Sequence, residues 1–440
     1  MRYRRAVDRP AIDLWWLKPA WLMLLLVVPV YLSFIVFDFE NVVPRRYIPG
    51  PNYWWGLLLL VTLALGAALG SYGAPKKARI RARREVLGIA AAAQIHIPAT
   101  LTGTLLALTL FAYAVWFGPL LIAPDTILQV FRGERDNVRD LVETMPGITT
   151  FTQCGAAYAV VYAIKRYAGS ESPQMWERLG LVLVFALALA RAFLWSERLA
   201  LLEVMVAYGI AAAAFYRFRS RGMERLAVAL PLVAPTLLYL AFTGTEYFRS
   251  WRFYQDYYDS IWQFSYERLF TYYAVASNSG IGLLEELRNW PQYTGRFVFE
   301  WAYVFPTIGP ALIDAFGDAR LDFSRFLLEY GRQEFNNPSG IFVIVYDIGY
   351  FGSALYFLAA GLLIGLAWKS FYLRRPGGLL FFPFCFLFVI ELLRFNYFAA
   401  SRFVPIAVSL LLAYAAIKGW RGNSQRPAPR WSPPLRRREA

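Results

Sequence analysis

The sequence is poor in charged residues and in the side chains that soluble enzymes use for catalysis. Only 17% of the 440 residues are charged, and there are one histidine and two cysteines. Cys154 and Cys385 lie far apart in apolar stretches, so no disulfide framework is indicated and both are expected to be apolar core residues. The hydrophobic share is 58% and occurs in blocks, which excludes an ordinary soluble domain.

Several catalytic motifs are missing as well. The chain has no glycine-rich phosphate loop followed by lysine, no His-Glu-x-x-His zinc motif and no nucleophile elbow. The single histidine, His96, precedes a predicted membrane span at its cytoplasmic end and is interpreted as structural. No metal or cofactor is therefore predicted, and a reaction on the outer face would use a carboxylate base or none.

The apolar blocks have the length of membrane-spanning helices. A span needs ~20 apolar residues, because backbone groups in the hydrocarbon must be satisfied within the helix. The sequence thus predicts an all-α integral membrane protein with about ten transmembrane helices. The predicted spans are 20–37, 54–71, 99–122, 148–166, 178–195, 198–216, 226–244, 339–367, 379–396 and 399–417. Before the third span, Pro98 is the predicted break, and the apolar stretch 86–97 is either a surface helix or part of a longer span.

Basic residues predict the orientation. With the N-terminus inside, the short inside segments hold 28 of the 45 lysines and arginines but only seven acids. Because basic loops stay in the cytoplasm, both termini are expected there. The runs 76–84 and 436–438 are interpreted as topology signals that contact lipid headgroups, not as nucleic-acid sites. Asp38 and Glu40 follow the first span, so a retained helix is expected and not a removed signal.

The predicted spans divide the chain into four regions. Residues 1–244 form a first bundle, 245–338 a large outer loop, 339–417 the last three helices, and 418–440 a disordered basic tail. A loop this long must fold. Its aromatic-rich part, 251–273, predicts helices on the membrane surface, which form either an interfacial aromatic belt or a platform for sugar rings. The segment 125–146 mixes charges of both signs and predicts a solvated capping helix.

Ionisable residues inside spans are costly and mark partners or cavities. Arg191 and Glu203 each lie six residues from Glu197 in the turn between the fifth and sixth spans, ~9 Å below it. They are expected at the same depth, either as a buried ion pair or as part of a site. Arg198, at the tip of this turn, is expected to face the outer space.

A second pair of charges flanks the turn between the ninth and tenth spans. Arg394 and Arg402 are expected at matching depth, and Glu391, one helical turn from Arg394, neutralises only one of them. The remaining charge suits a phosphate or diphosphate, although lipid headgroups or another helix are alternatives. Asp347 lies eight residues after Ser339, ~12 Å along the eighth span from its outer end, and is interpreted as a base or a counter-ion.

Three segments carry a resemblance to a known family. The first is FNNPSGIFVIVYDIGYFGSALYFLAAGLLIG at 335–365, the second Ser-Glu-Arg-Leu at 196–199, and the third Met-Pro-Gly at 145–147. Together with the large late outer loop, they resemble bacterial oligosaccharide repeat unit polymerases, the Wzy-type O-antigen polymerases. The matching positions in the first segment are Asn336, Ser339, Asp347, Gly349 and Gly352.

This resemblance implies a metal-independent glycosyltransferase in the bacterial cytoplasmic membrane that polymerises undecaprenyl-diphosphate-linked repeat units on the outer face. Arginines would stabilise the departing diphosphate. The implied partners are those lipid-linked glycans, the bilayer, a chain-length regulator and a flippase. The implied substrate-binding residues are Arg191, Arg198, Asn336, Arg394 and Arg402. The implied catalytic residues are Arg268, which would orient sugar or phosphate, and Asp347 or Glu267 as the base.

Other functions remain open from the sequence. An O-antigen ligase would need the same chemistry. A transferase that uses a polyprenyl monophosphate sugar would place acids after the first span, as in Asp38-Phe39-Glu40, but the first outer loop is short. A lipid-linked glycan flippase or transporter predicts broken helices in two matching halves, which the sequence does not show. A membrane scaffold predicts no matched arginines.

Overall fold

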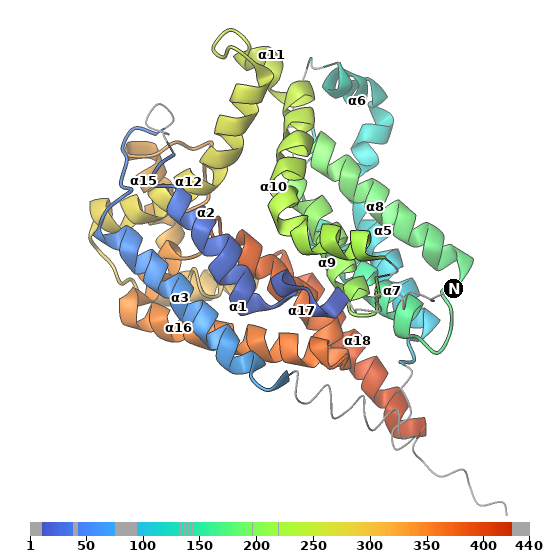
Figure 1. Ribbon diagram of the computed structural model, residues 1–440. Coiled ribbons are helices and arrows are strands. Elements are labelled where there is room, and N and C mark those ends of the chain that lie inside the picture. Colours follow the sequence, from blue (N-terminus) through green and yellow to red (C-terminus); the bar gives the residue numbers. More distant parts are fainter. Residues whose placement is uncertain are drawn as a thin grey trace, which may run out of the picture.

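The structure is a computed structural model that describes residues 11–37, 43–74 and 95–424, except 133, 135–137, 140, 143, 146, 196 and 219. Over these residues it is helical without a β-strand, and one isolated bridge joins Ile95 to Gly169 (Figure 1). The predicted all-α class is confirmed. The acids Asp38 and Glu40, the basic runs 76–84 and 436–438, and residues 86–94 of the apolar stretch before Pro98 lie outside the described residues.

A helix lies at each predicted span. Four of the described helices are long and apolar enough to cross a membrane, namely α3 (Pro51–Ser71), α5 (Ala99–Ile122), α10 (Arg221–Arg249) and α16 (Phe342–Tyr372). The other helices at predicted spans are α1 (Pro19–Leu22) continuing into α2 (Val28–Ser33), α7 (Cys154–Ala168), α8 (Met175–Leu194), α9 (Arg198–Ala213), α17 (Pro376–Glu391) and α18 (Phe403–Ser424). The last of these continues into the predicted disordered tail.

Local sequence explains several helix ends. Pro98 immediately precedes α5, in agreement with the predicted break. Ser220 caps α10, where its hydroxyl accepts a hydrogen bond from the backbone N–H of Met223. Such a cap satisfies one of the free N–H groups of the first turn.

Helices α3 and α16 pack along a seam of glycines and lie side by side in Figure 1. Gly66 and Gly70 of α3 face Gly361 and Gly365 of α16. A Cβ on Gly361 would stand 2.2 Å from the carbonyl oxygen of Leu63, so a larger residue cannot fit. Small residues four apart let two helix backbones approach closely, as they do between membrane helices.

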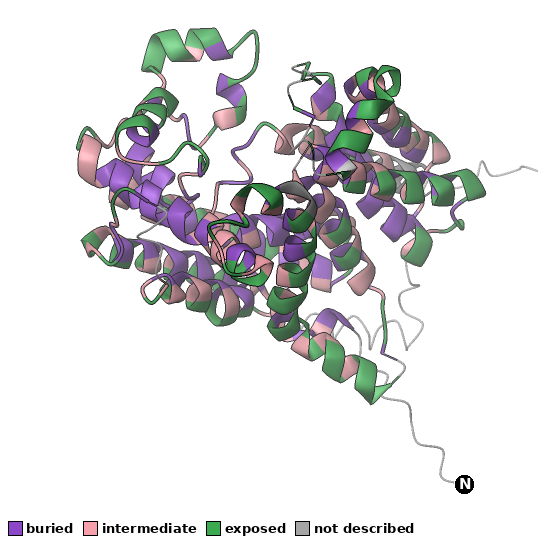
Figure 2. Ribbon diagram, turned by 90° about the horizontal axis from the view of Figure 1, so that it is seen from above, coloured by how far each residue is buried: buried purple, intermediate pink, exposed green. Residues whose placement is uncertain are grey.

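Helix α7 occupies the centre of the bundle. Its residues Cys154 to Lys165 are all buried, and it packs against α5, α8, α9, α17 and α18. Both cysteines are free and buried, as expected. Lys165 ends the buried stretch in a 2.7 Å ion pair with the buried Glu177 of α8. Figure 2 shows buried residues on the inner faces of the helices and exposed residues on the outer faces.

The long segment after α10 is folded, as expected. It contains α11 (Trp251–Tyr254), α12 (Ile261–Leu287), α13 (Glu300–Tyr303), α14 (Gly309–Phe316) and α15 (Ala319–Glu329). The second half of α12 is buried against α15 and α16, because its run of small residues permits close packing. This half, which lies beyond the stretch 251–273 predicted to lie on the membrane surface, is therefore a core helix, while most residues of 251–273 are exposed or half-buried.

The predicted capping helix over 125–146 is much shorter than expected. Only α6 (Pro124–Phe131) is helical, and the described residues that follow it form turns and bends. Val138 and Val142 of this stretch are buried beside Trp116 of α5 and Leu194 of α8. Because these valines anchor the chain to the bundle, the segment follows the bundle surface and does not extend as one solvated helix.

Candidate functional site

A cavity of about 610 Å³ lies where the α8–α9 turn meets the α17–α18 turn. Its wall also includes α10, α12 and the segment before α16. Five arginines and three glutamates line it, so the wall is net positive. The charged residues are Arg139, Arg198, Arg320, Arg394, Arg402, Glu197, Glu300 and Glu334. Gln333, Asn336, Asn337 and Asn396 contribute amides, and Tyr272, Tyr273, Phe297, Phe323 and Phe395 contribute rings.

The predicted ion pair between Arg191 and Glu203 is wrong. Arg191 pairs with Glu197 at 2.6 Å, and its Nη1 donates to the hydroxyl of Thr152 at 2.7 Å. Its guanidinium lies 4.2 Å from the ring centre of Trp116. The long side chain of Arg191 reaches the turn between α8 and α9, so Glu203 pairs with another residue. Arg191 does not line the cavity.

That partner is Arg402, which is held by two carboxylates. Nε and Nη2 of Arg402 donate to the two oxygens of Glu203 at 2.8 and 2.9 Å. Its Nη1 lies 2.8 Å from Glu197, and the hydroxyl of Tyr397 also donates to Glu203. Of the alternatives for the second charge of this turn, the structure shows pairing with another helix, because Glu203 reaches Arg402 from α9.

Arg394 has the partner that the sequence predicts. Its Nη1 lies 2.9 Å from the buried Glu391, three residues earlier. Its Nε is buried without a hydrogen bond, and the guanidinium lies about 6 Å from the rings of Tyr272 and Tyr273. Arg394 thus keeps donor capacity at the cavity wall.

Arg198 and Arg268 share a carboxylate that sequence reasoning missed. Glu246, near the end of α10, is fully buried and pairs with Nη2 of Arg198. Its Oε2 lies 3.4 Å from Nε of Arg268, whose Nη2 bonds to Glu334. Burial lowers the pKa of Arg268, but the carboxylate of Glu246, with that of Glu334, outweighs this and raises the pKa above its usual value. The signal for Glu246 in the sequence is a lone acid just after the predicted span 226–244.

Asp347 is not at the cavity. It is fully buried, and its Oδ1 accepts from the Thr294 hydroxyl at 3.1 Å and the Gly295 N–H at 2.8 Å. Its Oδ2 accepts from the N–H of Phe297 at 3.0 Å. The helix α16 breaks two residues later at Gly349, where φ is 71°. The carboxylate therefore holds the 294–297 loop in place.

Of the remaining predicted residues, some line the cavity and some do not. Asn336 is exposed and lines the cavity. Glu267 does not line it and accepts a 3.0 Å hydrogen bond from Gln263 on its own helix. The structure therefore brings together Arg198, Arg394, Arg402 and Asn336. Arg268 does not line the cavity itself but contacts Glu334, which does.

Apart from Asn336, sequence reasoning missed the cavity residues contributed by the long loop. Arg320 of α15 bonds to Glu300 of α13, and both line the cavity. The segment 333–337 contributes one glutamate and three amides. The cluster Gln-Glu-Phe-Asn-Asn is visible in the sequence, but its position opposite the arginine turns depends on how the loop folds.

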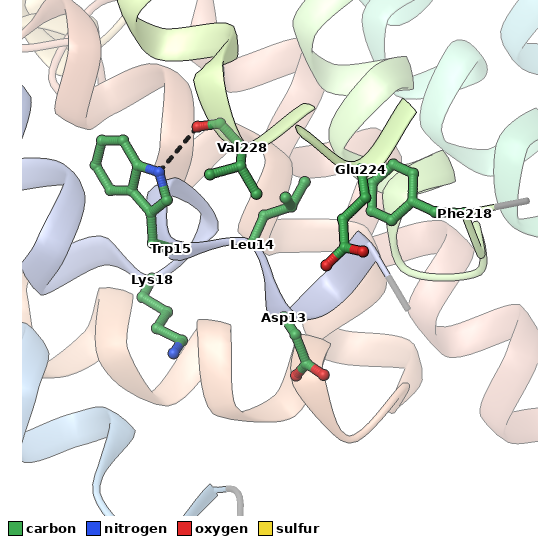
Figure 3. A pocket seen from close by; sticks show the side chains of 7 residues that line it. All are labelled: Asp13, Leu14, Trp15, Lys18, Phe218, Glu224 and Val228. Atoms are coloured by element: carbon green, nitrogen blue, oxygen red, sulfur yellow. Dashed lines mark hydrogen bonds between the residues drawn. The ribbon is translucent and has the colours of Figure 1, made fainter. Parts of the chain in front are cut away.

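A smaller cavity of about 190 Å³ lies at the other end of α10, between Asp13, Lys18 and Glu224 (Figure 3). The indole N–H of Trp15 donates to the carbonyl of Val228 at 3.0 Å beside it. None of the predicted site residues lines this smaller cavity.

The single histidine, His96, lies outside both cavities. Its ring nitrogen is 3.4 Å from the Ser170 hydroxyl and 3.8 Å from the Glu171 carboxylate.

Comparison of the chain with protein-family models, with curated proteins and with solved structures found no match.

Proposed function

We propose that this protein is a membrane glycosyltransferase that polymerises undecaprenyl-diphosphate-linked oligosaccharide repeat units into a surface polysaccharide. One observation carries the proposal: arginines from two helix turns and from the long loop line a single cavity beside amides and aromatic rings. Arginine forks bind phosphate oxygens, while amides and rings bind sugars. The resemblance to Wzy-type polymerases points in the same direction.

The pairing of these arginines is compatible with a diphosphate ligand. A guanidinium has five N–H donors, and one carboxylate accepts two of them in a fork. Arg198 pairs with Glu246, Arg320 with Glu300 and Arg394 with Glu391, and the three arginine side chains are 26%, 54% and 23% exposed. These three arginines lie at the cavity wall, where a ligand can contact them, while Arg402 is held by two carboxylates and orients the turn.

The chemistry needs charge stabilisation at the leaving group. A sugar hydroxyl of the acceptor attacks the anomeric carbon of the donor, the bond from that carbon to the diphosphate oxygen breaks, and the diphosphate leaves with its electron pair. Preorganised arginines stabilise the charge that develops there. No redox partner or further reactant is needed.

The acceptor proton goes to a carboxylate in this proposal. The expected bases, Asp347 and Glu267, do not line the cavity, whereas Glu334 does and has a 41% exposed side chain. A base must lie within hydrogen-bond reach of the acceptor hydroxyl, and Arg268 holds this carboxylate at the cavity wall. We therefore assign the proton to Glu334, and Arg268 orients that carboxylate.

The proposal includes ten membrane spans with both termini in the cytoplasm of a bacterium and the cavity on the outer face. The cavity lies at the start of α9 and the end of α17. The turns next to these helix ends are predicted to lie on the outer side of the membrane. A flippase would need access from both faces. The cavity walls come from one end of these helices, which favours an enzyme.

Deletion of the protein in its host, followed by gel analysis of surface glycan, tests the proposal. Single repeat units in place of a ladder support a polymerase, while lipid-free full-length polymer indicates a ligase. Complementation with Arg198→Gln or Arg320→Gln should fail to restore the ladder at equal protein level. The matched control is Arg325→Gln, which removes an exposed arginine from a helical pair with Glu329 outside the cavity. A normal ladder with both cavity variants would show that these arginines have no role.

A further inference from the structure

Glu246 is the buried point at which two predicted functional arginines meet. Its side chain is fully buried, yet its two oxygens face Arg198 of α9 and Arg268 of α12. The three groups therefore come from three helices, α9, α10 and α12. Glu246 itself does not line the cavity, whereas Arg198 does.

The contacts extend from Glu246 to the cavity in two directions. Arg198 reaches the wall directly and lies 3.9 Å from the ring centre of Phe242, one turn before Glu246. Arg268 reaches it through Glu334, and its guanidinium also lies 5.4 Å from the ring of Tyr254. Burying an unpaired carboxylate raises the free energy of the folded state. The pairing of Glu246 with Arg198 and Arg268 is therefore favoured and holds both guanidiniums in place.

We propose that Glu246 is a positioning residue that holds Arg198 at the cavity for diphosphate binding and, through Arg268, holds Glu334. This inference rests on the proposed function. Glu246 does not touch the substrate. Its removal should act only through Arg198 and Arg268.

A double-mutant cycle separates positioning from general stability. Purified full-length protein in detergent is titrated with undecaprenyl diphosphate, and the dissociation constant is measured for wild type, Arg198→Gln, Glu246→Gln and the double variant. Loss of a hydrogen bond between charged groups is worth about tenfold or more in affinity. We expect Glu246→Gln and Arg198→Gln each to weaken binding by about tenfold, with no further loss in the double variant, because both remove the same interaction.

Two further variants keep the inference testable if Glu246→Gln does not fold. Arg268→Gln/Glu246→Gln removes one charge of each sign and should bind more weakly than Arg268→Gln alone, because Arg198 loses its anchor. Glu246→Asp, which keeps the carboxylate, should bind more tightly than Arg198→Gln. Glu329→Gln, in an exposed pair, is the control and should bind like wild type.

The outcomes distinguish the two ideas. If wild-type protein does not bind undecaprenyl diphosphate, the proposed function is overturned and this inference with it. If wild type binds and Arg198→Gln weakens binding, but Glu246→Gln binds like wild type, the inference alone is overturned. The inference is also overturned if the losses in affinity of Arg198→Gln and Glu246→Gln add up in the double variant. It is overturned as well if Arg268→Gln and Arg268→Gln/Glu246→Gln bind equally.

Discussion

The arginines around the cavity differ in how they are held, and this decides what each substitution does. Arg402 is flanked by Glu203 and Glu197, while Arg320 forms one largely exposed pair. These partners come from helices distant in sequence, so spacing along one helix cannot predict them. The Glu391–Arg394 pair was predictable because it lies within one helical turn.

Arg402→Gln is expected to destabilise the protein by about 3 kcal/mol or more, because it leaves the fully buried Glu203 without its fork partner. Unfolding in detergent, followed by tryptophan fluorescence, measures the change. Arg402→Gln/Glu203→Gln should recover part of the loss, since it also removes the stranded charge. An Arg402→Gln variant as stable as wild type would contradict the pairing.

The pH dependence of stability depends in part on Glu197. Burial raises the pKa of its carboxyl, but the charges of Arg402 and Arg191 outweigh burial and hold the pKa below its usual value. The folded state thus binds fewer protons than the unfolded state at acidic pH. The stability that Glu197 contributes is present above the unfolded pKa of about 4.3 and is lost as the pH falls through the lower folded pKa.

Wild type and Glu197→Gln should therefore differ most in thermal midpoint near pH 6 and converge as the pH falls below about 4.3. Midpoints in detergent from pH 7 to pH 3 check this. A difference that stays constant over the whole range would mean that the carboxyl is not held ionised by its arginines.

At the scale of elements, apolar block length predicted where helices lie, and a helix is present at each predicted span. The sequence could not predict the break of α16 at Gly349 or the buried second half of α12. Both depend on long-range packing: the loop 294–297 bonds to Asp347, and small residues let α12 enter the core. Arg198, Arg394 and Arg402 could be predicted because charges near the ends of apolar blocks are visible in the sequence. Of the cavity residues on the folded loop, only Asn336 was predicted, because the positions of the others depend on how the loop folds.

The glycine seam between α3 and α16 gives a prediction at this scale. Gly361→Ala should destabilise the protein by about 1–3 kcal/mol, since its Cβ would clash with the carbonyl oxygen of Leu63 and separate the helices. Gly209→Ala is the matched control, because it too lies within a helix and its Cβ would meet nothing within 4 Å. Alanine favours a helix over glycine, so the control should be neutral or slightly stabilised. Equal unfolding midpoints for the two variants would show that the seam is not tightly packed.

At the scale of the whole molecule, the two cavities lie at opposite ends of α10, and only the larger one gathers arginines. The turns at the larger cavity contain Glu197 and Arg198 on one side and Arg394 to Arg402 on the other. The basic residues Lys369, Arg374 and Arg375 lie at the opposite end of α16 and α17. Since basic loops remain in the cytoplasm, this distribution predicts that the larger cavity lies outside.

Reporter fusions test that orientation. Alkaline phosphatase, which is active only outside the cytoplasm, should be active when fused after residue 305 and inactive when fused after residue 375, because α16 lies between these points and begins near the larger cavity. Green fluorescent protein, which fluoresces inside, should fluoresce when fused after residue 440. Replacing Arg374 and Arg375 with glutamine in the second fusion should raise its phosphatase activity, since these charges help to retain the loop. Phosphatase activity at 375 together with inactivity at 305 would place the cavity in the cytoplasm, where an acceptor on the outer surface could not reach it.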